Sequence, residues 1–145
     1  MTDTRPATAL SVDLFGHAIR LDTSCVHDPD SDVRRQLREY ARGERTSFDL
    51  TVGFPETFSG RLWERLRRIP CGETRTYGEL AAELGTAPVA VGGANARNPL
   101  PVVVPCHRVV GTDSLRGYRY PGLKERLLRH EGSAGSLTFE LDGSV

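Results

Sequence analysis

Cys106, His107 and Arg108 occupy three consecutive positions and place a thiol, an imidazole and a guanidinium side by side. The thiolate is the nucleophilic form of cysteine, and neighbouring cations favour it over the thiol. A free cysteine without such neighbours is more often an inert core residue. Because histidine and arginine are poor core residues, these positions favour a nucleophilic cysteine over a buried structural one.

The residues before the cysteine predict how its backbone is held. Residues 102–104 are three valines, which predict buried, extended backbone. Pro105 has a fixed φ and restricts the residue before it. We therefore expect Cys106 to start from a defined geometry at the end of a buried extended segment.

Length and composition bound the class of protein. A chain of 145 residues, 38% apolar and 26% charged, predicts one globular domain or one domain with a small appendage. No apolar run approaches the ~20 residues of a membrane-spanning helix, and the N-terminus lacks the order of a signal peptide. Three cysteines make a disulfide framework improbable. We therefore expect an intracellular, cytoplasmic protein (nuclear in a eukaryote), monomeric and not bound to a membrane.

The charges are unevenly distributed although they cancel over the whole chain. Residues 57–132 carry 12 Lys and Arg against 7 Asp and Glu, whereas residues 1–56 carry 7 against 10. A basic block of this kind suits a polyanionic partner.

The first third of the chain predicts a small α/β unit. Apolar residues alternate over 10–14 and return over 18–21, which predicts a β-hairpin turning at Gly16 and His17. Helical spacing follows over 33–41, and residues 44–56 are typical of a linker with an extended piece at 48–52. Cys25 and His27 could form half a metal site, but no second pair lies nearby, so we expect no metal.

The basic block predicts three helices. An apolar face recurs over 58–69, a capping box at Thr76 and Glu79 opens a helix that Gly85 ends, and Pro88 opens a third helix reaching about residue 96. The short connection between the second and third of these helices has the length that is typical of a helix-turn-helix. An ordinary αα-hairpin has the same spacing, and the basic charge favours DNA binding.

After the central site, residues 111–118 are typical of a loop that could form a wing or hairpin. Residues 124–130 predict another helix and residues 137–141 one short strand.

Four separated blocks now carry a family resemblance. Residues 58–132 resemble the C-terminal, DNA-binding and active-site domain of the O6-alkylguanine-DNA alkyltransferases, the methylated-DNA–protein-cysteine methyltransferases. The blocks are IPCGETRTYGEL at 69–80, VGGANARNP at 91–99, PCHRVV at 105–110 and HEG at 130–132. Residues 37–43 resemble a helix of the family's N-terminal domain more weakly.

The resemblance implies a single-turnover, suicidal enzyme for DNA repair. Cys106 would take the alkyl group from O6 of guanine, with Glu131 orienting His107 and His107 drawing the thiol proton through a water. This order repeats the nucleophile, base and orienter of hydrolases, without a step that releases the group. No metal and no organic cofactor is implied.

The implied partner is double-stranded DNA containing O6-alkylguanine, with the third helix in the minor groove and the damaged base flipped out of the stack. Tyr77 would help to rotate the nucleotide and bind the base, and Asn98 would join the recognition helix to the active-site strand. The remaining residues expected to contact DNA or the base are Val89, Ala90, Gly92, Gly93, Ala94, Arg97, Arg108, Val109, Tyr118 and Arg119. Each could also have a plain structural role, with Tyr77 as a core aromatic, Asn98 as a turn residue and Glu131 as a surface charge.

One departure from the family pattern concerns the tool that flips the base. The family usually has an arginine three residues before the Gly-Gly pair, and Val89 occupies that position here. An apolar wedge can hold a base step open, but it offers no hydrogen bond to the orphaned cytosine, so we expect weaker flipping or altered specificity.

We therefore expect an α/β (α+β) protein with an abbreviated N-terminal domain at 1–55, a winged-helix-like alkyltransferase domain at 56–134 and a tail at 135–145. Its expected function is direct reversal of O6-alkylguanine damage. Two alternatives stay open: a non-catalytic sensor of alkylated bases, and a plain winged-helix regulator with a buried thiol.

Overall fold

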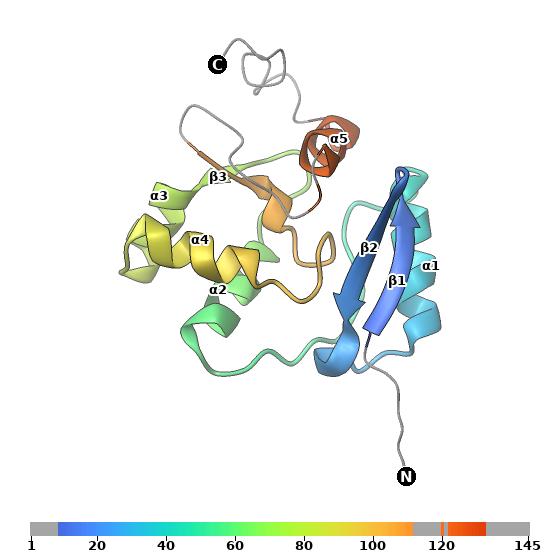
Figure 1. Cartoon of the computed structure of the whole chain (residues 1–145), viewed down its shortest axis with the longest axis horizontal. Coiled ribbons are helices and arrows are strands. Elements are labelled where there is room, and N and C mark those ends of the chain that lie inside the picture. The colour runs from blue at the N-terminus through green and yellow to red at the C-terminus, as the bar shows by residue number, and fades with distance from the viewer. Residues whose placement is uncertain (1–8, 112–119, 121, 133–145) are drawn as a thin grey trace.

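A computed structural model of the protein describes residues 9–111, 120 and 122–132. Figure 1 shows the N-terminal hairpin and helix α1 on one side of the molecule and helices α2, α3 and α4 on the other, with α5 above the region between them. None of the described helices is long and apolar enough to cross a membrane. The expected wing at 111–118 and strand at 137–141 lie wholly or almost wholly outside the described residues.

The N-terminal unit is an antiparallel hairpin covered by one helix. Strands β1 (Ala9–Leu14) and β2 (His17–Asp22) pair from Ala9 with Asp22 to Leu14 with His17, as the alternation predicted. Its turn lies one residue earlier than predicted, at Phe15 and Gly16, whose φ values of 50° and 82° suit a tight hairpin turn. The 3₁₀ turn η2 (Thr23–Cys25) follows.

Helix α1 (Asp30–Ala41) buries one face against the hairpin and begins three residues before the predicted start. Its inward residues Val33, Leu37 and Tyr40 are all at most 1% exposed. The linker after it is held rather than loose: Val52 forms a β-bridge with Val26. The buried residues of the N-terminal unit therefore belong to one hydrophobic core that continues through the rest of the molecule.

Helices α2 (Phe58–Leu66), α3 (Tyr77–Leu84) and α4 (Pro88–Ala96) form the basic half. The predicted capping box is confirmed, because Thr76 and Glu79 each accept from the other's backbone amide. Gly85 ends α3 with φ 68°, a left-handed conformation that glycine adopts without strain. Local sequence signals therefore set both ends of the first helix of the predicted helix-turn-helix.

Close packing around α2 requires a glycine. A β-carbon at Gly60 would lie 1.9 Å from the carbonyl oxygen of Pro55. Trp63 on the same helix donates from its indole nitrogen to the carbonyl of Ala94 at 2.9 Å. Helix α4 is thus tied to α2 through a buried hydrogen bond as well as through apolar contact.

The expectation of extended backbone at 102–104 is wrong. The three valines are at most 4% exposed, as predicted, but they lie in a tight turn that Val102 enters with φ 77°. Asn98 explains how the turn is held: its amide donates to the Val104 carbonyl at 2.8 Å and accepts from the Leu100 amide at 2.9 Å. A side chain therefore supplies the hydrogen bonds that a sheet would have given.

The second small sheet lies next to this turn. Strands β3 (Arg75–Thr76) and β4 (Val109–Val110) pair in parallel, and the 3₁₀ turn η3 (Cys106–Arg108) runs directly into β4. Helix α5 (Leu123–His130) packs on η3 with Leu123, Leu127 and Leu128 buried. The mixture of helices and two small sheets is the predicted α+β class.

Candidate active site

Cys106 opens η3 at the end of the buried turn. It is 5% exposed, and its amide donates to the Val104 carbonyl at 2.7 Å. None of the three cysteines forms a disulfide. Pro105 precedes it with φ −79°, so the expected fixed backbone geometry at the cysteine is present, although a turn and not a strand provides it.

The residue after Cys106 forms a histidine–carboxylate pair. His107 Nε2 lies 2.7 Å from Glu131 Oε2, and both side chains are 0% exposed. Burial works against the charge of Glu131, but hydrogen bonds from His107 and Arg108 outweigh it and hold the pKa of the carboxyl well below its usual range. Because an ionised carboxylate can only accept, His107 donates from Nε2.

The other imidazole nitrogen is then left with its lone pair. His107 Nδ1 is buried and has no hydrogen-bond partner among the described residues. Burial lowers the pKa of His107 below its usual value, although Glu131 acts to raise it. A neutral imidazole with one free, basic nitrogen next to a thiol is the arrangement of a general base and its nucleophile.

Arg108 does not lie where a DNA contact would require. Its side chain is 6% exposed, and Nε and Nη2 donate to Oε1 and Oε2 of Glu131, each at 2.9 Å. Nη1 donates to the Ile69 carbonyl at 2.6 Å. The expected DNA contact of Arg108 therefore does not fit the structure, because its guanidinium is bound to the buried Glu131 carboxylate. The same hydrogen bonds hold Glu131 in position.

Two further side chains reach the site that the sequence did not indicate. Tyr40, on α1, donates from its hydroxyl to Glu131 Oε2 at 2.6 Å. Asn95, on α4, donates to the Cys106 carbonyl at 3.3 Å. The sequence around these two residues does not indicate their partners. Tyr40 is 91 residues from Glu131, and Asn95 is 11 residues from Cys106.

Helix α4 exposes some of the residues that were expected to face DNA and buries others. Val89 is 82% exposed, Arg97 is exposed and donates to Ser59 at 3.1 Å, and Ala90 and the Gly92–Gly93 pair are half-buried. Ala94 is 0% exposed and faces α2, so its expected DNA contact does not fit. The reason is that α4 packs on α2 at this point, where Trp63 also donates to the Ala94 carbonyl.

Tyr77 lies half-buried at the start of α3, with its ring beside Gly92. A β-carbon at Gly92 would lie 3.8 Å from the Tyr77 ring, which is ordinary contact. An alanine would therefore also fit at this position, and α4 lies within van der Waals reach of the tyrosine. This places Tyr77 at the junction of the two helices of the helix-turn-helix.

Of the residues expected to contact the base next to Cys106, Val109 lies within the described residues, and the backbone carbonyls of Cys106 and Val109 both have hydrogen-bond donors. The Val109 carbonyl accepts from Lys124 Nζ at 2.7 Å, and the Cys106 carbonyl accepts from the Val109 amide. The Cys106 carbonyl also accepts from Asn95, so both of its lone pairs are used, whereas the contact with Lys124 by itself leaves the Val109 carbonyl a second lone pair. Tyr118 and Arg119 lie outside the described residues.

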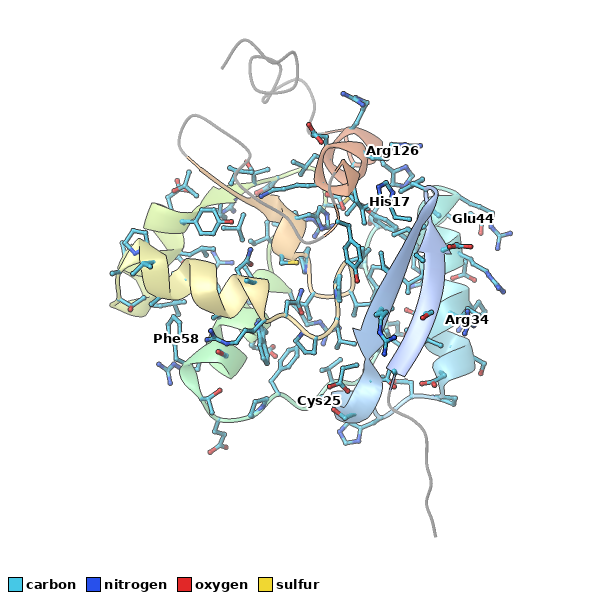
Figure 2. The ribbon with its side chains drawn as sticks, in the orientation of Figure 1. His17, Cys25, Arg34, Glu44, Phe58 and Arg126 are labelled. Atoms are coloured by element: carbon cyan, nitrogen blue, oxygen red, sulfur yellow. The ribbon has the colours of Figure 1, made fainter. Side chains whose placement is uncertain are left out.

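No cluster of three or more His, Cys, Asp or Glu that could hold a metal occurs within 9–111, 120 and 122–132. Cys25 lies at the end of the hairpin unit opposite His17 and Arg126 (Figure 2). The described residues therefore add no partner pair to Cys25 and His27.

Comparisons with known proteins agree with this geometry. Residues 57–133 match the DNA-binding domain of 6-O-methylguanine DNA methyltransferase. A methylated-DNA–protein-cysteine methyltransferase of Archaeoglobus fulgidus is 44% identical over 111 residues, covering 71% of this chain and 76% of that protein. Another, of Methanosarcina acetivorans, is 48% identical over 107 residues, covering 70% and 69%.

Solved structures give the same answer for the fold. The crystal structure of Mycobacterium tuberculosis O6-methylguanine methyltransferase superposes with a TM-score of 0.72 at 34% identity, covering 86% of this chain and 92% of that one. The OGT of the same organism in complex with DNA gives a TM-score of 0.67 at 44% identity, covering 73% and 70%.

Fold and site together define a DNA-binding protein with a buried cysteine next to a histidine–carboxylate pair. The chain belongs to the 6-O-methylguanine DNA methyltransferase family. It is an enzyme of DNA repair by direct reversal, and the non-catalytic sensor is not favoured.

Proposed function

We propose that Cys106 is the acceptor of an alkyl group from O6 of guanine in double-stranded DNA. The observation that supports it most is the pair of His107 and Glu131, buried together at 2.7 Å with Nδ1 of His107 left unpaired among the described residues. Such a pair can take a proton from a neighbouring thiol, and Cys106 is the next residue in the chain.

The transfer balances as a single displacement. The Cys106 thiol gives its proton to His107 Nδ1 (through a water, if the family resemblance holds), and the Glu131 carboxylate stabilises the imidazolium that forms. The sulfur then forms a bond to the alkyl carbon while the bond from that carbon to O6 breaks. The leaving base takes up one proton and becomes guanine, and the cysteine ends as a thioether. No later step frees the sulfur, so each molecule reacts once.

Helix α4 is the proposed minor-groove element. Its outward residues are small or uncharged from Pro88 to Gly93, and Arg97 is exposed at its end. A base inside a duplex hides its O6 from a thiol that is 5% exposed, so the nucleotide must rotate out at a cost of a few kcal/mol. Val89 is the proposed wedge, and Tyr77 the proposed donor to the flipped base.

The finer organisation belongs to the same proposal. The protein acts as a monomer, and residues 56–134 form the alkyltransferase domain, preceded by the abbreviated domain at 1–55 and followed by a tail at 135–145. The match to the family over 57–133 supports a boundary near residue 56.

Intact mass spectrometry tests the transfer. The protein is incubated with a duplex that contains one O6-methylguanine, and with the same duplex without the lesion. We expect a stoichiometric gain of one methyl group that the unmodified duplex does not give and that Cys106→Ala abolishes. Tight binding to the lesion without a gain in mass would refute the transfer and favour the sensor.

A second experiment tests the wedge at Val89. The variant Val89→Arg restores the residue type that the family usually has there, and Val89→Lys serves as a control that adds the same charge at the same position without a guanidinium. We expect Val89→Arg to raise the single-turnover rate on duplex DNA but not on a single strand. An unchanged duplex rate would show that Val89 does not limit flipping.

A further inference from the structure

Tyr40 joins the N-terminal unit to the active site through two different groups. Its hydroxyl donates to Glu131 Oε2 at 2.6 Å, and its backbone carbonyl accepts from His130 Nε2 at 2.7 Å. Its ring also meets the His130 ring edge-on, with centroids 5.0 Å apart. Tyr40 of α1 therefore contacts two consecutive residues at the end of α5, His130 and Glu131.

The hydroxyl shares its acceptor with the proposed base. Glu131 Oε2 accepts from three donors: Tyr40, His107 at 2.7 Å and Arg108 at 2.9 Å. Burial and the charge of Glu131 both raise the pKa of Tyr40, so the phenol keeps the proton that it donates. Tyr40 is 1% exposed, so water does not compete for this contact.

The other ionisable groups around the carboxylate are few. Cys71, between α2 and β3, is close enough for Glu131 to raise the pKa of its thiol, after the larger effect of burial. Lys124, on α5, acts on His107 in the direction of a lower pKa, as Arg108 does. The donors to Glu131 Oε2 are therefore two neutral groups, the Tyr40 phenol and the His107 imidazole, and the charged Arg108 guanidinium.

We propose that Tyr40 is a positioning residue for the transfer: it orients the Glu131 carboxylate and, by sharing Oε2 with His107, sets the pH at which His107 takes up a proton. The proposal rests on the proposed function, because it assumes that His107 acts on Cys106. It extends the active site into the N-terminal unit, beyond the segment 57–133 that matches the family.

The sign of the effect follows from the shared oxygen. Without the phenol proton, more negative charge stays on Oε2 and the imidazolium of His107 is better stabilised. His107 then takes up a proton at higher pH, and the fraction with a free Nδ1 falls on the acid side. Loss of the orienting contact lowers the rate at every pH, as the loss of an outer-shell partner commonly does.

Tyr40→Phe tests the proposal, since it removes one hydroxyl and keeps the ring. Gln36→Leu is the matched control: Gln36 lies one turn earlier on α1, is 3% exposed, and exchanges two hydrogen bonds with the Asp49 backbone far from Glu131 in the hydrogen-bond network. Both variants lose buried hydrogen bonds of α1, so both lose stability. Only Tyr40→Phe changes the donors on the carboxylate.

The readout is the pH dependence of Cys106 alkylation between about pH 5 and 9. Iodoacetamide is the probe: the sulfur displaces iodide, and peptide mass spectrometry separates Cys106 from Cys25 and Cys71. For Tyr40→Phe we expect the acid limb to move up by about 0.5 unit and the rate to fall about tenfold. Methyl transfer from duplex DNA is measured on the same samples.

The role of Tyr40 is read from the acid limbs of the three pH profiles. A limb that moves in Tyr40→Phe but not in Gln36→Leu supports the proposal. Coincident limbs in Tyr40→Phe and the parent, or equal shifts in both variants, overturn it and leave Tyr40 as a packing residue. If the parent transfers no methyl group from DNA, the proposed function fails, while the iodoacetamide profiles still decide the role of Tyr40.

Discussion

Replacing Glu131 with glutamine should destabilise the fold far more than the loss of one surface charge would. The carboxylate is 0% exposed and binds an Arg108 side chain that is 6% exposed. Glutamine has the same size and keeps one acceptor oxygen. Its NH₂ group, however, replaces an oxygen that accepts hydrogen bonds, and it faces donors that it cannot accept from. The guanidinium is left buried with a neutral partner, and breaking a buried pair in this way costs about 3–5 kcal/mol.

The lower end of that range applies here, because the glutamine oxygen can still accept from Tyr40 or His107, and Arg108 keeps its bond to the Ile69 carbonyl. A loss of about 3 kcal/mol corresponds to a fall in Tm of about 10 °C for a chain of this size. Urea unfolding at pH 7.5, with thermal melting beside it, measures both quantities.

Glu83→Gln provides the control. Glu83 makes an even shorter ion pair, 2.7 Å from Arg65 against 2.9 Å between Glu131 and Arg108, but Glu83 is 45% exposed. Solvent screens this pair, so its loss should cost less than about 1 kcal/mol. If both variants lost the same small free energy of unfolding, burial would not be the reason that the ion pair of Glu131 contributes more to stability than that of Glu83.

Three further predictions concern the turn, the packing and the pH dependence of stability. Asn98→Ala should cost about 1–3 kcal/mol in urea unfolding, because the buried Leu100 amide loses its acceptor and the Val104 carbonyl keeps only the Cys106 amide as a donor; an unchanged free energy of unfolding would contradict this. Gly60→Ala should lower Tm, because its β-carbon meets backbone at 1.9 Å, whereas Gly78→Ala, with nothing closer than 3.9 Å, should leave Tm unchanged or raise it; the reverse order would be inconsistent with the packing. Finally, the pKa of His107 in the folded state lies below its usual 6.5, and that of Glu131 lies below its usual 4.5. As the pH falls, the unfolded chain therefore binds protons at these two groups before the folded chain does, which destabilises the fold. The urea midpoint should therefore decrease below about pH 6.5 and again below about pH 4.5, and a midpoint that is constant from pH 7.5 to 4 would disprove the linkage.

The elements that the sequence predicted correctly have local causes. The hairpin follows from the alternation of Leu10, Val12 and Leu14, and the capping box needs only Thr76 and Glu79, three residues apart. The proximity of Cys106 and His107 is given by the chain itself. In each of these cases, the residues that interact are neighbours in the sequence.

The features that were missed depend on partners that lie far away. Arg108 looked like a surface cation until Glu131, 23 residues later, was placed beside it. Three consecutive valines are typical of a strand, and only the two hydrogen bonds from Asn98 explain why they turn. Tyr40 had a helical position and nothing in its surroundings to indicate a carboxylate at the other end of the chain.

The long separation between Tyr40 and Glu131 also has a consequence for how the site is made in the cell. The hairpin and α1 can form from short-range contacts as soon as they leave the ribosome. At about 5–20 residues per second, Glu131 is synthesised on the order of ten seconds after Tyr40. Until then His107 lacks the carboxylate that accepts from its Nε2, so the active site is completed last, after most of the surrounding protein has been synthesised.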